Sequence, residues 1–235
     1  MALKYQRILL KISGEALGGE KGTGFDEPTM DAICGGVKKA HELGVQIGIV
    51  VGGGNFWRGR SSGKMERTLA DKIGMLATVM NCLYASEIFR AEGMETSVYA
   101  PYPVGLYTEN FNKDKVQRDL KEGKIVFYAG GTGHPYFSTD MAIALRAVET
   151  DCDVMLMAKS IDGVYDDDPH KNPQAKKYDE MTYQEILEKN LKVMDLPAAA
   201  LCMENHMPAV LFALKEERSI IRVVGGEKIG TTIVG

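Results

Sequence analysis

Short apolar runs alternate along this chain with amphipathic segments of helical periodicity. The apolar runs predict strands at residues 7–12, 45–51, 96–100, 124–129, 154–158, 209–214 and 231–234. The segments between them predict helices at residues 28–43, 66–91, 112–121, 139–147, 183–189 and 197–206. Residues 45–51 are apolar almost throughout, which is typical of a strand that helices cover on both faces. The pattern predicts an α/β fold, a three-layer αβα sandwich with a mainly parallel central sheet.

The length of the chain favours one large domain. Its 235 residues contain no linker, internal repeat or low-complexity tract. Length alone is a weak guide to domain number, but the strand–helix alternation continues without a break in composition. We therefore predict a single domain that spans residues 1–235.

Three of the predicted strands end in turns that contain glycine. These turns are Lys11-Ile12-Ser13-Gly14, Gly52-Gly53-Gly54 and Gly130-Gly131-Thr132-Gly133. Glycine lets a ligand approach the backbone closely, and a helix that follows such a turn attracts anions with its free N–H groups. The carboxyl ends of parallel strands form one edge of the sheet, where ligands bind. The three turns together predict a ligand with several phosphates, and tight turns that bind nothing are the alternative.

The two common phosphate-binding motifs do not occur. The chain has no GxxxxGK[ST] sequence, so it is not a P-loop NTPase. After Gly52 and Gly54, Trp57 stands where a GxGxxG motif needs its third glycine. A dinucleotide-binding fold of that type is therefore disfavoured.

Few charged residues lie near these turns, and those few are candidates for phosphate chemistry. Lys11 ends a strand predicted to be buried, Arg58 follows the triple glycine, and Lys159 ends a later strand. Asp140 begins the helix after residues 130–133, where it could orient Lys11, and Asp71 could accept hydrogen bonds from a ribose. The alternative for each is a solvated side chain, or for Asp140 a residue that only stabilises its helix.

Composition narrows the possible partners. A net charge of −4 offers no general attraction for nucleic acid or an anionic membrane, so we expect neither as a partner. The four cysteines form no CxxC pair and the four histidines form no HExxH motif, so we expect reduced thiols and no dedicated metal site. Residues 1–12 resemble no signal peptide, and no apolar run reaches membrane-spanning length. We expect a cytoplasmic protein.

Several segments resemble the amino acid kinase family, whose fold is an αβα sandwich without a P-loop. They are KISGEAL at 11–17, VGGGN at 51–55 with Arg58-Gly59, and DGVY at 162–165 with Asp168-Pro169. Within that family, three further segments are most similar to the bacterial UMP kinases. They are DKIGMLATVMN at 71–81, GGTGHPYFSTD at 130–140 and LKVMD at 191–195. The resemblance covers essentially the whole chain.

The resemblance implies transfer of the γ-phosphoryl group of Mg-ATP to UMP, in pyrimidine nucleotide biosynthesis. It implies catalysis by Lys11 and Arg58, with Asp140 organising the lysine. UMP binding is implied for Gly53, Asp71, Thr132, Gly133, His134, Pro135, Tyr136, Phe137, Ser138 and Thr139. ATP binding is implied for Lys11, Ile12, Ser13, Gly14, Gly54, Arg58, Lys159, Tyr165 and Asp168. His134 departs from the family pattern, because many relatives carry asparagine there.

The resemblance also implies an organisation and a regulation. It implies an acceptor-nucleotide lobe at about residues 1–150 and an ATP lobe at about residues 151–235. It also implies that Mg²⁺ is held mainly through the ATP phosphates and that the enzyme is a homohexamer. Residues 18–24 match a region linked to GTP, so GTP and UTP are possible effectors. Two alternatives stay open at this point. One is a family member that phosphorylates a carboxylate or carbamate, and the other is a nucleotide-sensing regulator without turnover.

Overall fold

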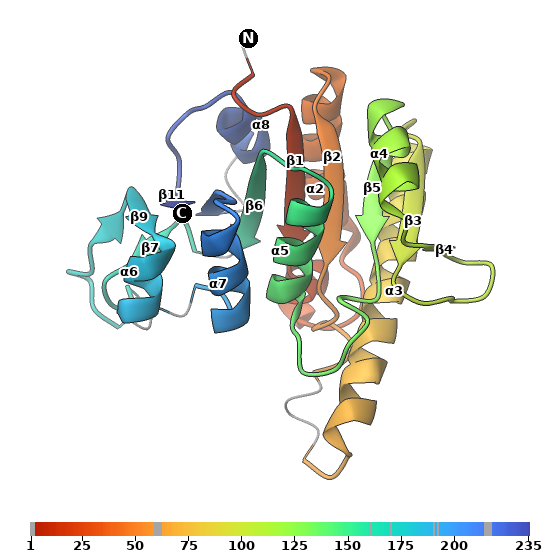
Figure 1. The fold of residues 1–235 in the computed structure, drawn as a ribbon, viewed down its shortest axis with the longest axis horizontal. Helices are drawn as coiled ribbons and strands as arrows, with labels where there is room; N and C mark the ends of the chain where they lie inside the picture. Colours follow the sequence, from red (N-terminus) through yellow and green to blue (C-terminus); the bar gives the residue numbers. More distant parts are fainter. Residues whose placement is uncertain are drawn as a thin grey trace.

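A computed structural model describes residues 3–58, 63–159, 161–169, 171–189, 191, 193–213 and 218–235. In these residues, one sheet of nine strands runs through the molecule in the order β4-β3-β5-β2-β1-β6-β10-β11-β9 (Figure 1). The strands are β1 (Arg7–Ile12), β2 (Gln46–Val51), β3 (Thr96–Ala100), β4 (Glu109–Asn110), β5 (Ile125–Tyr128), β6 (Val154–Lys159), β9 (Glu180–Thr182), β10 (Ala209–Ala213) and β11 (Thr231–Val234). A separate two-stranded sheet pairs β7 (Val164–Tyr165) with β8 (Lys177–Tyr178).

The sheet is mainly parallel, as the sequence predicts. β1 lies at its centre and pairs in parallel with both β2 and β6, with Lys11 opposite Val50 and Met157. The exception is the antiparallel pair β10 and β11, after which β9 pairs in parallel with β11. The two strands at that end therefore run against the rest of the sheet.

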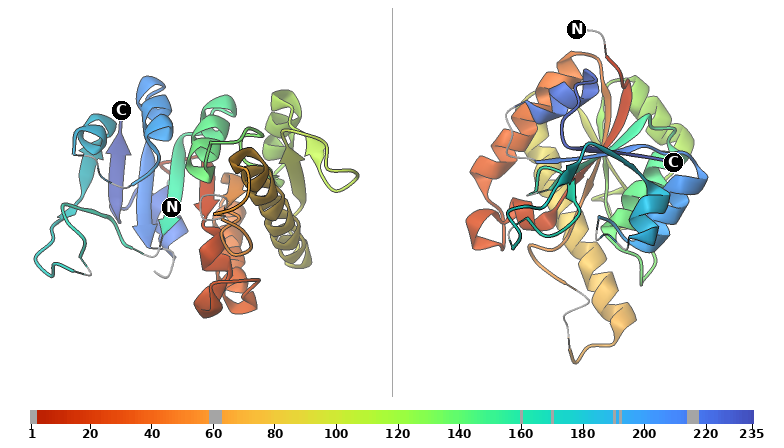
Figure 2. Two further views of the ribbon diagram at one scale, coloured as in Figure 1. Left: turned by 90° about the horizontal axis from the view of Figure 1, so that it is seen from below. Right: turned by 90° about the vertical axis from the view of Figure 1, so that its left-hand side faces the viewer.

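Helices cover both faces of the sheet, which makes three layers (Figures 1 and 2). One hydrophobic core lies under α2 (Glu27–Glu42), α3 (Arg67–Ala91) and α8 (Ser219–Val224). The other lies under α4 (Lys113–Lys121), α5 (Thr139–Glu149), α6 (Tyr183–Glu188) and α7 (Leu196–Glu204). Two short helices, α1 (Gly14–Leu17) and the 3-10 helix η1 (Gly19–Lys21), follow β1 directly.

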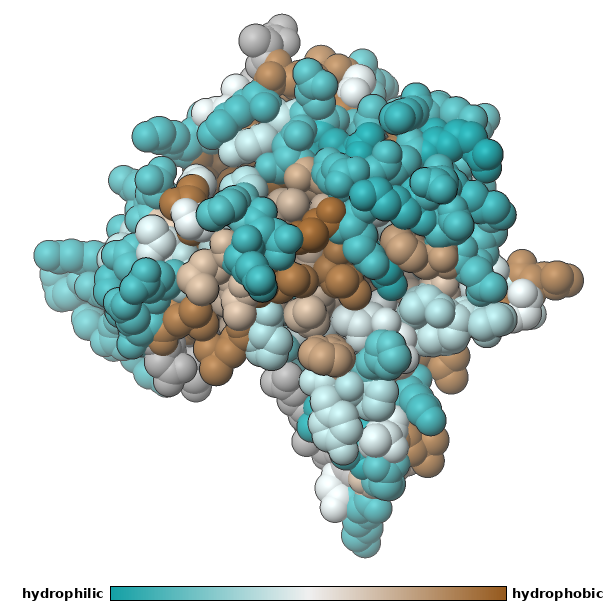
Figure 3. All heavy atoms as spheres, in the orientation of Figure 1, coloured by the Kyte–Doolittle hydropathy of each residue, from teal (hydrophilic) through white to brown (hydrophobic). Residues whose placement is uncertain are grey.

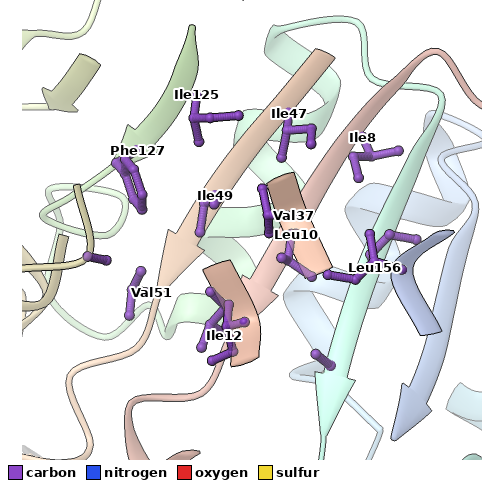
Figure 4. Packing of buried hydrophobic residues seen from close by; sticks show 14 of the residues in the cluster. Ile8, Leu10, Ile12, Val37, Ile47, Ile49, Val51, Ile125, Phe127 and Leu156 are labelled. Atoms are coloured by element: carbon purple, nitrogen blue, oxygen red, sulfur yellow. The ribbon is translucent and has the colours of Figure 1, made fainter. Parts of the chain in front are cut away.

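Alternation along each strand divides its side chains between the two cores. In β1, Ile8, Leu10 and Ile12 belong to the first core and Leu9 to the second. Figure 4 shows the β1 side chains beside their counterparts from β2, β5 and β6, facing Val37 of α2. Because both faces are buried, these strands are apolar throughout, and the predicted three-layer architecture follows.

Each predicted strand and helix is present, with ends that differ by a few residues. Leu214, the last residue of the predicted strand 209–214, lies outside the described residues. The elements that the apolar pattern does not predict are short: α1, η1, β4, β7, β8, β9 and α8. Such elements contain too few residues to show a period; β7, for example, consists of Val164 and Tyr165 alone.

The surface of the helical layer shown in Figure 3 is mostly hydrophilic, with hydrophobic residues in its centre around α5 and α7. No helix in the described part of the chain combines the length and the hydrophobicity needed to cross a membrane. The first turns of α3 extend well beyond the rest of the molecule (Figures 1 and 2). The middle of α3 therefore lies beside the ends of the central strands.

Candidate active site

A cavity of about 380 Å³ opens at the carboxyl ends of the central strands. It brings together all three glycine turns, from the ends of β1, β2 and β5, and the side of α3. Its lining consists of Lys11, Ser13, Gly14, Glu15, Gly52, Gly53, Gly54, Trp57, Arg58, Arg67, Asp71, Gly74, Met75, Thr78, Gly131, Thr132, Phe137, Ser138 and Thr139. Residues more than 120 positions apart in the sequence therefore share one concave site.

The first two glycine turns pack backbone against backbone. A Cβ atom on Gly14 would lie 2.5 Å from both the carbonyl oxygen of Gly52 and the backbone nitrogen of Gly54. A Cβ atom on Gly53 would lie 2.8 Å from the carbonyl oxygen of Gly74 on α3. A side chain on either glycine would push these segments apart. Glycine is therefore needed at both positions so that the backbone segments can approach each other closely.

Free backbone donors line the cavity. Within the described ranges, the N–H groups of Gly53, Gly54, Gly131 and Thr132 donate no hydrogen bond. By contrast, the N–H group of Gly52 bonds the carbonyl oxygen of Ile12 at 2.9 Å. Unpaired N–H groups around a cavity are suited to bind phosphate oxygens.

The triple glycine does not lead directly into a helix, which corrects our expectation from the sequence. α3 begins only at Arg67, and its N-terminal N–H groups bond the side chain of Glu66. The dipole of α3 therefore does not point at residues 52–54. α5 begins nearer its turn, at Thr139, with the hydroxyl of Ser138 as cap.

Lys11 lines the cavity and forms an ion pair with Asp140, which lies outside the lining. Their side chains are 14% and 17% exposed, so the pair is largely shielded from water. The hydroxyl of Ser138 accepts a hydrogen bond of 3.0 Å from the backbone N–H of Asp140. The start of α5 therefore fixes the carboxylate, and the carboxylate fixes the ammonium group at the cavity wall.

A second lysine lies close to this pair. Lys159, the last residue of β6, donates a hydrogen bond of 2.5 Å to the carbonyl oxygen of Val193. Burial lowers the pKa of Lys159; the nearby charge of Asp140 opposes that shift and the charge of Lys11 adds to it. Lys159 therefore contributes positive potential close to the Lys11–Asp140 pair, although it does not line the cavity.

Arg58 lines the cavity and forms an ion pair with Glu15. Both side chains are more than half exposed. The Glu15 side chain also lies against Gly54, within 3.3 Å of the position a Cβ atom would take. A carboxylate of the chain itself therefore holds Arg58 beside the glycine turn.

Asp71 belongs to a cluster that the sequence does not reveal in full. Both of its carboxylate oxygens accept hydrogen bonds of 2.8 Å from Nε of Arg67, and Oδ2 also accepts one of 2.8 Å from the N–H group of Tyr136. Arg67 lies 5.3 Å from the centre of the Tyr136 ring. Arg67 is a cavity residue that sequence reasoning missed. Its spacing of four residues from Asp71 on a predicted helix is the signal that could have found it.

Several residues implied to bind substrates lie away from the cavity lining. Gly133, His134, Pro135 and Tyr136 belong to the loop behind Thr132, and the hydroxyl of Thr132 accepts a hydrogen bond from the N–H group of His134. The side chain of Ile12 points into the core. Tyr165 donates a 2.8 Å hydrogen bond to Asp162, and Asp168 follows in the loop between β7 and β8. Roles for these residues stay predictions.

The comparisons with known proteins agree on one family. A family model described as the amino acid kinase family matches residues 6–213. The crystal structure of UMP kinase from Bacillus anthracis is 33% identical, with a TM-score of 0.95 over 98% of this chain and 96% of that chain. The structure of UMP kinase from Ureaplasma parvum is also 33% identical, with a TM-score of 0.92 over 99% of this chain and 100% of that chain.

A third structure, uridylate kinase from Archaeoglobus fulgidus, shares the fold at 24% identity, with a TM-score of 0.71 over 96% of this chain and 99% of that chain. These matches confirm the predicted fold class. They also extend over nearly the full length of each chain compared. With its αβα sandwich and its match over residues 6–213, the chain belongs to the amino acid kinase family.

Proposed function

We propose that this chain is a UMP kinase, an enzyme that transfers the γ-phosphoryl group of ATP to UMP and releases UDP and ADP. The observation that carries the proposal is the Lys11–Asp140 pair beside a cavity lined by three glycine turns. The 33% identity to two UMP kinases, over nearly the full length of the chain, supports the choice of acceptor.

The chemistry requires that two polyanions meet end to end. The acceptor is a phosphate oxygen of UMP that is already ionised at neutral pH, so the reaction needs no strong general base. Lys11 and Arg58 neutralise charge on the group in transfer, and the N–H groups of Gly53 and Gly54 orient the phosphates. Asp140 acts through Lys11 as a positioning residue, because its carboxylate bonds the ammonium group.

Arg58 must change partner during this reaction. In this structure its guanidinium pairs with Glu15. Because both side chains are well exposed, that pair is weak, and a phosphate with greater charge would replace the carboxylate. Glu15 thereby holds Arg58 near its working position until ATP binds.

Two subsites follow from the positions of the turns. Gly53, Asp71, Phe137, Ser138, Thr139 and residues 132–136 would form the UMP side, and Lys11 to Gly14, Gly54 and Arg58 would hold the ATP phosphates. Lys159, Tyr165 and Asp168 would line the ATP base and ribose pocket. The UMP side would belong to an acceptor lobe at about residues 1–150, which would also supply the groups that bind the ATP phosphates, and the ATP base and ribose pocket would belong to an ATP lobe at about residues 151–235.

Mg²⁺ fits this site as a companion of ATP. The described residues contain no group of three or more His, Cys, Asp or Glu side chains placed to hold a metal ion. The ion would therefore enter on the β- and γ-phosphates, where it would neutralise part of their charge. Lys11 and Arg58 would supply the remaining positive charge.

The proposal includes a cellular setting. A UMP kinase serves pyrimidine nucleotide biosynthesis, and we place this one in the cytoplasm. We also propose a homohexamer, with GTP and UTP as effectors of the enzyme and residues 18–24 as the GTP-linked segment. Size-exclusion chromatography with light scattering tests the assembly, and initial rates with added GTP or UTP test the regulation.

A phosphotransfer assay with purified protein tests the activity. We expect UDP and ADP from UMP and Mg-ATP, with lower rates for CMP and for dUMP, which lacks a ribose hydroxyl. Aspartate, glutamate and acetylglutamate serve as acceptors for the alternative family activity. ADP release with one of these acids and not with UMP, or nucleotide binding without any turnover, would contradict the proposal.

A further inference from the structure

One helix holds two of the three glycine turns through buried polar side chains. On α3, Asn81 donates a 2.6 Å hydrogen bond from Nδ2 to the carbonyl oxygen of Gly52. One helical turn earlier, the hydroxyl of Thr78 accepts a 2.8 Å hydrogen bond from the N–H group of Gly130. The first bond holds the turn at the end of β2, and the second holds the turn after β5.

Asn81 is part of a fully satisfied amide network. Its Nδ2 also donates to Oδ1 of Asn55 at 2.7 Å, and its Oδ1 accepts from Nδ2 of Asn55 at 3.1 Å. Asn55 uses its remaining N–H group to bond the carbonyl oxygen of Gly24 at 2.8 Å. Asn81 is 0% exposed and Asn55 is 2% exposed. All four amide hydrogens therefore have partners, which makes the arrangement rigid.

Thr78 is equally constrained. Its hydroxyl donates a 2.7 Å hydrogen bond to the carbonyl oxygen of Met75, one turn back on α3. The hydroxyl hydrogen is thus already used, and its oxygen lone pair points at Gly130. Thr78 is 4% exposed, so water does not compete for this bond.

These bonds fix the two backbone turns that carry the unpaired N–H groups of the cavity. With Gly52 held by Asn81, the next two N–H groups belong to the cavity-lining residues Gly53 and Gly54 and have no partners in the described chain. With Gly130 held by Thr78, the same is true of Gly131 and Thr132. The separation of the two donor sets is therefore fixed by two side chains of one helix, those of Thr78 and Asn81.

We infer that Thr78 and Asn81 are positioning residues for phosphoryl transfer. They set the distance between the Gly52–Gly54 turn and the Gly130–Thr132 turn, and so the distance between the two phosphates that react. The inference rests on the proposed function, because it concerns the same cavity. It assigns α3 a role in turnover that is distinct from binding either nucleotide.

The test compares Thr78→Val with Thr78→Ser. Valine has nearly the same shape but cannot accept the bond from Gly130, whereas serine keeps the hydroxyl. Because a shift of about 1 Å in reacting groups can cost 10²-fold in rate, we expect Thr78→Val to lower kcat by roughly 10–100-fold. KM for UMP and ATP should stay close to the wild-type values, and Thr78→Ser should recover most of the lost kcat.

The chain offers an independent measure of binding. Trp57 is its one tryptophan and lines the cavity, so its fluorescence reports on UMP without turnover. We expect Thr78→Val to bind UMP with nearly the wild-type Kd. The matched control is Ser86→Ala on the same helix, a 0% exposed hydroxyl that bonds Arg90 and Thr96 away from the cavity. It should leave kcat unchanged.

If Thr78→Val does not fold, as judged by circular dichroism, Asn81→Asp replaces it. That variant keeps the side-chain shape but lacks the N–H group that bonds Gly52, and the same loss of kcat with unchanged KM is expected. A wild-type kcat in the substituted enzymes, or a loss seen only as weaker UMP binding, would overturn the inference. A wild-type chain that forms no UDP would instead contradict the proposed function.

Discussion

Lys11 lies on β1, the central strand of the sheet. Its ion-pair partner Asp140 lies on α5, one of the helices that cover the second core. Both side chains are largely buried, so removal of either leaves a charge without compensation. In the proposed reaction, the ammonium group also faces the phosphates in the cavity. The same residue therefore contributes to local structure and to transition-state stabilisation.

We expect Lys11→Ala to reduce kcat by about 10²–10³, with smaller changes in KM, because a charged stabiliser in a site shielded from water is worth about 3–4 kcal/mol. Steady-state kinetics on the folded variant measure this. The control is Lys38→Ala, whose ammonium group pairs with Glu92 on the surface of α2 at 3.0 Å, far from the cavity. Near-normal turnover in Lys11→Ala would remove Lys11 from the mechanism.

Because of Lys159, we expect the stability of the protein to depend on pH. Its pKa in the folded protein is below the ordinary lysine value of 10.5, chiefly because of burial. Between these two pKa values the unfolded chain binds the proton that the folded chain has lost, so the free energy of unfolding rises with pH in that window. Below the window, the buried charge lowers stability.

Lys159→Met removes this cost. We expect the variant to have the higher free energy of unfolding at neutral pH, and we expect its advantage to shrink as the pH approaches 10.5. Urea unfolding at a series of pH values measures both quantities. A variant that is less stable than wild type throughout would show that the bond to Val193 outweighs the burial of the charge.

At the scale of elements, the site depends on how closely its turns pack. The backbone of Gly14 touches the Gly52–Gly54 turn with no room for a side chain. The glycines of α2 differ, since nothing lies within 4 Å of the Cβ position of Gly35. Replacing each glycine by alanine therefore compares a position without room for a side chain, Gly14, with one that has room, Gly35.

We expect Gly14→Ala to reduce kcat by about 10²-fold, because its new methyl group must separate the two turns. Gly35→Ala should instead raise the free energy of unfolding by about 0.5–1 kcal/mol, because alanine is favoured in a helix interior. Kinetics and thermal unfolding of both variants check this. Full activity in Gly14→Ala would mean that the turns can separate without loss of function.

The architecture could be predicted from the sequence because buried strands and long helices have strong periodic signals. The strands β1, β2 and β3 and the helix α3 were predicted to within a residue or so of their ends. The edge strands β4 and β9 contain two and three residues, too few to show alternation. They form because the neighbouring strand offers free backbone groups, which a sequence pattern does not contain.

The candidate site likewise contains residues that the sequence reveals and residues that it does not. Lys11, Arg58 and the glycine turns were recognisable because local residue types at strand ends carry the signal. Arg67, Thr78 and Asn81 were missed as contributors. The roles of Asn81 and Thr78 depend on contacts with residues 29 and 52 positions away, and the role of Arg67 depends on helix geometry.

At the scale of the whole molecule, all four cysteines are buried in the two cores. Burial raises the pKa of Cys82 to about 12 and the pKa values of Cys34, Cys152 and Cys202 to about 11. Thiolate is the reactive form of cysteine, so these thiols are both inaccessible and protonated in the native state.

We expect Ellman's reagent to modify none of the four thiols quickly in the native protein and all four in guanidinium chloride. The rate of slow native labelling then reports on global opening of the cores. Because the cysteines lie on α2, α3, α7 and the segment before β6, uniform rates would indicate a single cooperative unit. Rapid native reaction of any one thiol would show local opening of its layer.

The position of β11 has a consequence for biosynthesis. This strand, residues 231–234, lies between β10 and β9, and within the part of the chain that the structure describes β9 has no other neighbour in the sheet. Residues 180–182 are therefore translated some 50 positions before residues 231–234, the strand with which they pair. The nascent polypeptide must carry this edge unpaired until the final strand emerges from the exit tunnel, and chaperones that shield exposed backbone would act in that interval.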